Sequence, residues 1–175
     1  MATTKWVLDP THSEVQFKVK HLMITNVTGS FTIVNASIET ESDNFAHAKV
    51  SFTADAASVT THNEQRDGHL KTGDFFEPEK YPELKFDATD YVPSTGKVTG
   101  NLTIKGTSKP VTFDVDFHGT NKDPWGNEKA GFSLKGKISR KDWNLNWNAA
   151  LESGGVLVSD EVKINAEVQF AKQAA

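Results

Sequence analysis

The segment VKINAEVQF at residues 162–170 alternates apolar and polar residues without a break. Successive side chains of a β-strand point to opposite faces of the sheet, so a period of two predicts a strand with one apolar and one polar face. The residues expected on the apolar face are Val162, Ile164, Ala166, Val168 and Phe170.

The same alternation recurs along the chain in about eight segments, which are bounded by turn-forming residues. No charged residue interrupts the apolar face, whereas Lys and Asp recur on the other face. The further residues predicted to share the apolar face are Val15, Phe17, Val19, Val27, Gly29, Phe31, Ile33, Ala48, Val50, Phe52, Ala54, Leu84, Phe86, Ala88, Val98, Gly100, Leu102, Ile104, Val111, Phe113, Val115, Phe117, Ala130, Phe132, Leu134, Gly136 and Ile138.

A sheet of this size has to stack on a second layer or close on itself, and the chain offers one appreciable helix to cover it. Closure is the simpler solution. We therefore predict an all-β fold, a single closed, extended antiparallel β-barrel of about eight strands, built by one domain over residues 1–175.

The predicted helix covers residues 63–72 and lies near one mouth of the barrel. Thr61 and Glu64 have the spacing of a capping box, and Gly73 follows as a C-cap. Residues 142–159 are rich in Asn and Trp, and they predict a long loop or a broken hairpin at the barrel rim.

The chain carries 19 Lys and Arg against 23 Asp and Glu, a formal net charge of −4, and these charges are interspersed. Such a chain is not expected to bind nucleic acid. It has no Cys and therefore no disulfide. No segment has the length of a membrane-spanning helix, and no signal peptide is recognisable. We expect a cytoplasmic protein, or a periplasmic one if a signal peptide has been removed, without an integral membrane segment.

Two interpretations of the interior remain open. Small residues on the inward face, such as Gly29 and Gly136, either complement large ones in a packed core or leave a tunnel. An occupant of such a tunnel has to be long and apolar, because the lining offers almost no hydrogen bonds. The predicted tunnel residues are Phe17, Val19, Phe31, Ile33, Val50, Phe52, Phe86, Leu102, Phe113, Val115, Phe117, Phe132 and Leu134.

Several motifs resemble the signatures of the YceI-like family, and they follow one another in order along nearly the whole chain. They are WVLDPTHS at 6–13, GSF at 29–31, RDGHL at 66–70, DFF at 74–76, YP at 81–82, GNLTIKG at 100–106 and KPV at 109–111. The resemblance implies a lipocalin-like barrel that binds polyisoprenoids or similar long-chain amphiphiles, commonly as a homodimer. The chain departs from the family at Asn144, where many relatives have Gly after the Arg-x-Asp-aromatic segment.

Barrel and resemblance together predict a protein that binds, sequesters or transports a long-chain lipid without catalysis and without a cofactor. The resemblance implies a polyisoprenoid such as an isoprenoid quinone or an isoprenyl phosphate, or a fatty amide. Two alternatives stay open: an enzyme that acts on isoprenoid lipids, and a stress-related interaction module with a packed barrel.

A polar ligand head group is predicted to meet His21, Arg66 or His69 at the barrel mouth, since the forked donors of Arg suit phosphate. The composition of a catalytic triad is present in Asp9, His12 and Ser13. However, adjacent strand residues point to opposite faces, and no Gly-x-Ser-x-Gly elbow occurs. We therefore predict no catalytic residues, and expect Asp9 and His12 to hold the start of the first strand by hydrogen bonds.

The histidines also raise the question of a metal site. His62 and His69 are about two helical turns apart, whereas common zinc motifs place a pair on adjacent turns. We predict that the chain holds no metal ion.

Overall fold

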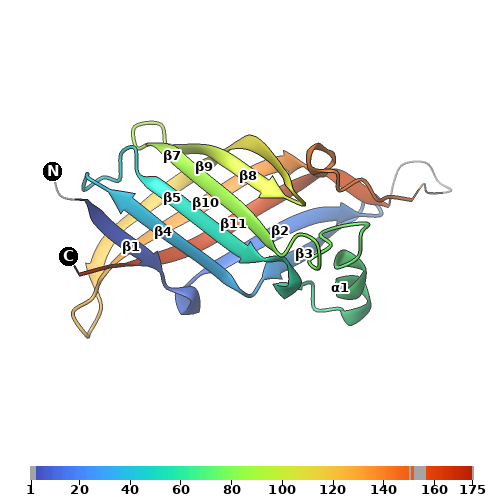
Figure 1. Ribbon diagram of the computed structural model, residues 1–175, viewed down its shortest axis with the longest axis horizontal. Coiled ribbons are helices and arrows are strands. Elements are labelled where there is room, and N and C mark those ends of the chain that lie inside the picture. The colour runs from blue at the N-terminus through green and yellow to red at the C-terminus, as the bar shows by residue number, and fades with distance from the viewer. Residues whose placement is uncertain (1–2, 150, 152–156, 175) are drawn as a thin grey trace.

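The computed structural model describes residues 3–149, 151 and 157–174 as a β-barrel with one α-helix in this part of the chain (Figure 1). The strands are β1 (Thr4–Leu8), β2 (Glu14–His21), β3 (Thr25–Phe31), β4 (Val34–Thr40), β5 (Lys49–Asp55), β6 (Val59–Thr60), β7 (Glu83–Val92), β8 (Lys97–Ile104), β9 (Thr107–Lys122), β10 (Glu128–Ser139) and β11 (Val158–Lys172). The helix is α1 (Glu64–Leu70), and three 3-10 turns are η1 (Pro10–His12), η2 (Ala56–Ser58) and η3 (Arg140–Trp143).

Within the described residues, eight strands close the barrel in the order β1-β4-β5-β7-β8-β9-β10-β11, and β11 returns to β1. Every strand pair is antiparallel, and β2, β3 and β6 continue the sheet from β11. Because β11 pairs with β1 near its end and with β2 nearer its start, β1 and β2 lie along the same long strand. The predicted closed antiparallel barrel with a short helix near one mouth is confirmed.

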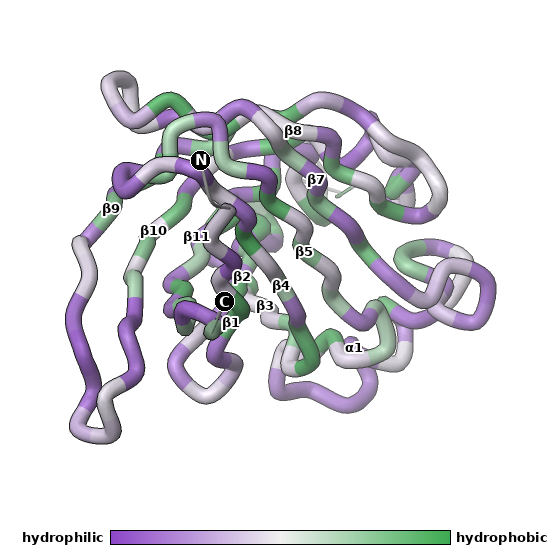
Figure 2. The backbone as a smooth tube through the Cα atoms, turned by 60° about the vertical axis from the view of Figure 1, so that its left-hand side comes forward, coloured by the Kyte–Doolittle hydropathy of each residue, from purple (hydrophilic) through white to green (hydrophobic). Residues whose placement is uncertain are grey.

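The alternation that predicted the barrel is visible along its strands as alternating hydrophobic and hydrophilic positions (Figure 2). The segment 162–170 lies within β11, whose pairing with β10 runs in register from Lys129 opposite Ala171 to Ser139 opposite Glu161. Phe132, Leu134 and Ile138 of β10 lie opposite apolar residues of β11 in this register. The apolar faces of these two long neighbouring strands therefore form one continuous wall of the interior.

The helix is shorter than predicted, and its caps differ. Asn63 is the N-cap, because its side chain accepts a hydrogen bond from the backbone N–H of Arg66 at 2.9 Å. Thr61 instead bonds to Asp67 and Arg66, so the predicted capping box is wrong. The chain leaves the helix at Lys71, so the predicted C-cap at Gly73 is also wrong.

Two residues that were predicted to face the barrel interior, Ile33 and Phe117, are partly or largely exposed instead. Ile33 is 61% exposed, because β3 ends at Phe31 and Ile33 lies in the turn before β4. Phe117 is 36% exposed and lies next to a β-bulge, where the register of β9 against β10 shifts at His118. Alternation does not predict where a strand ends or where an extra residue interrupts its pairing.

No helix among the described residues is long and apolar enough to cross a membrane.

Candidate functional site

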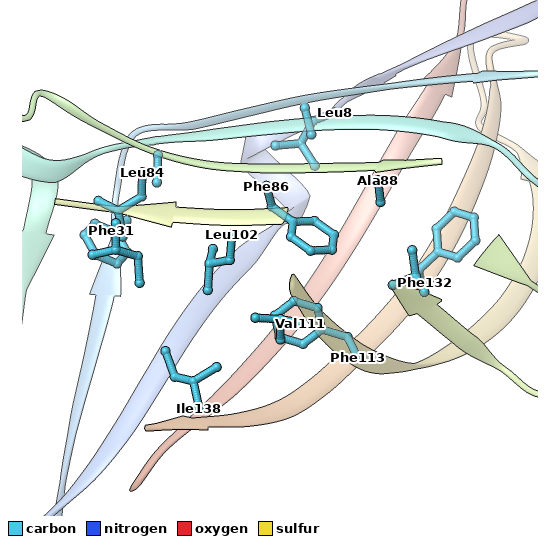
Figure 3. Close-up of a cluster of buried hydrophobic side chains, with 14 of the residues drawn as sticks. Leu8, Phe31, Leu84, Phe86, Ala88, Leu102, Val111, Phe113, Phe132 and Ile138 are labelled. Carbon is cyan, nitrogen blue, oxygen red and sulfur yellow. The ribbon is translucent and has the colours of Figure 1, made fainter. Parts of the chain in front are cut away.

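The barrel encloses a cavity of about 250 Å³. Leu84 and Phe86 from β7, Leu102 from β8, Phe113 from β9 and Ile138 from β10 point into it from neighbouring strands (Figure 3). All of the predicted tunnel residues except Ile33 and Phe117 line this cavity, namely Phe17, Val19, Phe31, Val50, Phe52, Phe86, Leu102, Phe113, Val115, Phe132 and Leu134. Among the described residues, the only polar or ionisable side chains in the lining are Gln16, Tyr91 and Arg140.

Aromatic side chains close the cavity at the end where both chain termini lie (Figure 1). Phe45 lies at the centre of this group, with ring centroids 5.3 Å from Trp6, 5.3 Å from Phe117 and 5.2 Å from Phe132. Phe170 packs on Phe132 at 6.0 Å. We call these five residues the aromatic plug. Phe117 therefore closes the barrel end instead of lining the cavity.

The opposite end of the cavity lies next to α1. Leu70 and Phe75 reach the lining from the helix and the chain after it. Leu145 and Val158 reach it from the predicted rim loop, of which residues 150 and 152–156 lie outside the described residues; we call its residues 143–149 the rim segment. His69 packs edge-on against Trp147 at 4.7 Å, so α1 and the rim segment contact each other across this end. We call this end the mouth.

Small residues on the inward face do both of the things that the sequence left open: some complement large side chains in a packed core, and others leave space in the cavity. A Cβ atom on Gly29 would lie 2.3 Å from Cζ of Phe17, and one on Gly136 would lie 2.6 Å from Cδ1 of Phe113. These two glycines thus seat aromatic rings that pack directly on the backbone. By contrast, Ala54 lines the cavity, so space for an occupant is left beside some small residues but not beside others.

Arg140 is the one charged residue among the described lining residues, and its side chain is 3% exposed. Its Nε donates to the Ser159 carbonyl at 2.9 Å, and its Nη1 donates to the carbonyls of Leu145 and of Trp147, the latter at 2.8 Å. Burial lowers the pKa of the Arg140 guanidinium, and the nearby Asp160 carboxylate opposes this shift. Arginine stays charged nonetheless. The guanidinium therefore fastens the rim segment to the barrel.

The three predicted head-group residues do not line the cavity. Arg66 donates from Nε to the Thr61 hydroxyl at 2.7 Å and from Nη2 to the Thr61 carbonyl at 2.9 Å, which ties α1 to the preceding chain. His69 contacts Asp74, with Nε2 and Oδ2 2.9 Å apart. His21 ends β2 and is half-buried. Arg66 and His69 are thus bonded to neighbouring residues at the mouth, and the head-group role of the three side chains stays a prediction.

Asp9, His12 and Ser13 do not form a catalytic triad. Nδ1 of His12 lies 2.8 Å from Oδ2 of Asp9, but the Ser13 hydroxyl donates to the Asp9 carbonyl at 2.7 Å and accepts from the Gln169 N–H at 3.0 Å. Lys129 also donates to Asp9, at 3.1 Å. These bonds connect the corner between β1 and β2 with β10 and β11, which agrees with the structural role expected for Asp9 and His12.

Among the described residues, no group of three or more His, Cys, Asp or Glu side chains has the arrangement of a metal site.

A closed antiparallel barrel with an apolar cavity, which aromatic side chains close at one end, defines a class of small binding barrels. The model of the YceI-like domain matches residues 6–170, and a UPF0312 protein of Staphylococcus aureus strain N315 is 38% identical over 96% of this chain and 98% of its own length. The chain therefore belongs to the YceI-like family.

Solved structures agree with this assignment. The chain is similar to the YCEI protein of Campylobacter jejuni, at 37% identity and a TM-score of 0.74 over 89% of this chain and 90% of that one. A polyisoprenoid-binding domain from Saccharophagus degradans, implicated in plant cell wall breakdown, is 15% identical with a TM-score of 0.72 over 96% of this chain and 98% of that one. At this identity the second likeness concerns the fold.

Proposed function

We propose that this protein binds, and sequesters or transports, a long-chain amphiphilic lipid whose tail occupies the barrel cavity. The lining carries the proposal, because it is hydrocarbon except for Gln16, Tyr91 and Arg140, and the Arg140 guanidinium is already bonded to the backbone. Burial of hydrocarbon is worth about 25 cal/mol per Å². A polar guest would lose hydrogen bonds to water and gain few in return.

The volume of the cavity sets how much of a tail it encloses. An engineered apolar cavity of about 150 Å³ binds benzene. At the same cavity volume per carbon atom as for the six carbons of benzene, the cavity of about 250 Å³ encloses about ten carbon atoms. The tail of a longer lipid then extends toward the mouth, and its head group lies outside the barrel, since the aromatic plug closes the other end.

The ligand class that we propose is a polyisoprenoid, such as an isoprenoid quinone or an isoprenyl phosphate, with a fatty amide as the second choice. Membership of the YceI-like family supports this class. The name of the Saccharophagus degradans domain, which describes it as polyisoprenoid-binding, agrees with it. Family resemblance also supports a homodimer, which sedimentation equilibrium of the purified chain tests directly.

Mass spectrometry of the purified protein tests the function, first in the native state and then after organic extraction. We expect an isoprenoid or fatty species at near-stoichiometric occupancy. A mass without ligand that stays unchanged after incubation with quinones and isoprenyl phosphates would contradict the proposal and favour a packed interaction module.

Two substitutions on one strand separate the cavity from the rest of the barrel. Ala54 lines the cavity, whereas its neighbour Thr53 is not part of the lining. Ala54→Leu should lower ligand occupancy because the added atoms take up cavity volume, and Thr53→Leu should leave it unchanged. Equal occupancy in the two variants would place the ligand outside the cavity.

A further inference from the structure

A second apolar feature lies outside the cavity, in the loop between β2 and β3. Leu22, Met23 and Ile24 are 40%, 55% and 79% exposed, and we call these three residues the hairpin tip. The backbone of Leu22 and Met23 is left-handed, with φ of 52° and 61°, a conformation that favours Gly or Asn in a hairpin loop. Three consecutive exposed apolar residues form a patch of the kind that marks an interaction site.

The hairpin tip lies at the mouth of the barrel (Figure 1). The backbone N–H of Leu22 donates to the Leu157 carbonyl at 2.9 Å, and His21 pairs with Val158, which lines the cavity. A surface that covers the tip therefore also lies next to the mouth.

The strands around the tip are positively charged. Apart from the buried Arg140, residues 17–28, 136–143 and 158–163 contain five basic and three acidic residues, although the whole chain has an excess of acidic ones. Two of the three carboxylates are paired, Asp160 with Lys141 at 3.4 Å and Glu161 with Lys137 at 3.8 Å. Lys20, next to the tip, and Lys163 are exposed and make no ion pair within the described part of the chain.

We propose that the hairpin tip inserts into the surface of an anionic lipid bilayer, with Lys20 and Lys163 close to the head groups. A stable protein interface buries at least about 1,200 Å², far more than three residues of one loop supply. A bilayer surface, by contrast, accepts a few apolar side chains and gains from each basic neighbour. Attachment to a bilayer goes beyond the proposed function. Transfer of a lipid from the bilayer into the cavity would be the use of this attachment, and that use rests on the proposed function.

Flotation of the full chain with vesicles tests the attachment without any cavity ligand. We expect the protein to float with equimolar phosphatidylglycerol and phosphatidylcholine vesicles, and to float less with phosphatidylcholine alone or at raised salt, because screening weakens attraction to the head groups. The triple variant Leu22→Ser, Met23→Ser, Ile24→Ser should bind about tenfold more weakly or worse. Lys20→Gln should weaken binding about fivefold.

Trp125→Ser provides the matched control, because Trp125 is 84% exposed in the turn between β9 and β10 at the opposite end of the barrel. This variant should float like the original protein. The proposal is overturned if the original protein does not float, or if the tip variant floats as well as the control. It is also overturned if the tip variant changes only self-association in sedimentation velocity, which would assign the tip to a second copy. Each of these outcomes is independent of whether extraction finds a cavity ligand.

Discussion

At the scale of single residues, Asn144 shows how the chain turns at the rim without a glycine at this position. Its backbone is left-handed, with φ of 63°, and it ends η3 by donating its N–H to the carbonyls of Arg140 and Lys141. Asn adopts this conformation more readily than other residues that carry a Cβ. Its side chain also donates to the Thr107 hydroxyl at 3.2 Å.

Substitution of Asn144 should follow this backbone requirement. Asn144→Gly should change the free energy of unfolding by less than about 1 kcal/mol, because the relaxed left-handed backbone offsets the lost side-chain bond. Asn144→Val should cost about 1–2 kcal/mol or more, since a branched side chain opposes a positive φ. Denaturant titration measures both. Equal stabilities of the Gly and Val variants would contradict the account.

The Asp9 carboxyl should make the free energy of unfolding depend on pH in the acidic range. Hydrogen bonds from Thr11, then from His12 and from Lys129, hold the pKa of the Asp9 carboxyl well below its usual range, although burial opposes them. A carboxyl with a lowered folded-state pKa stabilises the protein above its unfolded pKa of about 3.9 and loses this contribution as the pH falls toward the folded value.

The variant Asp9→Asn measures this contribution. At pH 7 it should be less stable than the original protein by about 2 kcal/mol, since bonds to a charged acceptor are lost. The difference should shrink as the pH falls below about 4. Urea unfolding at several pH values checks this, and a difference that stays constant down to pH 2 would argue against the role of the carboxylate.

At the scale of elements, the sequence predicts strands well where alternation is long and poorly where it is short. β11 and β10 extend over many alternating residues, and both are where we expected them. β4 was missed, because the preceding alternation was continued to Ile33, whereas the inward residues Val34, Ala36 and Ile38 of β4 are offset from it by one position. Tyr91 reaches the cavity because the register of β7 against β8 shifts after Ala88, and a bulge leaves no trace in the alternation.

The alternation in the sequence could have indicated that Arg140 points into the barrel. It continues the inward series of Leu134, Gly136 and Ile138, but a charge on that face contradicts the rule that identified the other lining residues. The resolution is that η3 and the rim segment present carbonyl oxygens to the guanidinium. No pattern in the sequence indicates which backbone carbonyls will meet the Arg140 guanidinium. Only the folded structure shows them.

Loss of this guanidinium should loosen the rim segment. Arg140→Met leaves the carbonyls of Leu145, Trp147 and Ser159 without their donor, which should cost about 3 kcal/mol or more and raise hydrogen exchange in residues 145–149. Lys141→Met is the control, because Lys141 makes only an exposed ion pair with Asp160, worth about 0–1 kcal/mol. Unchanged exchange in the Arg140 variant would show that other contacts hold the rim.

At the scale of the whole molecule, the two ends of the barrel differ in how far the sequence predicts them. The apolar wall follows from strand periodicity, and most of the cavity lining was predicted from it. The aromatic plug was not, because Phe45 lies in the loop between β4 and β5, where no periodicity assigns a direction to its side chain. Yet Phe45 is 2% exposed, and it sets the depth of the cavity.

Truncation of Phe45 should therefore change both the stability of the protein and the tail length of the ligand that it prefers. Phe45→Ala should cost about 3–5 kcal/mol, because the lost ring leaves a void between Trp6, Phe117 and Phe132. The same void lengthens the cavity, so the folded variant should bind isoprenoids with longer tails in preference to shorter ones. Thermal unfolding gives the first effect, and competition between isoprenoids of graded length in native mass spectrometry gives the second. Trp125→Ala, at the same end but exposed, should change neither. A destabilised Phe45→Ala variant with an unaltered length preference would mean that the tail does not reach the aromatic plug.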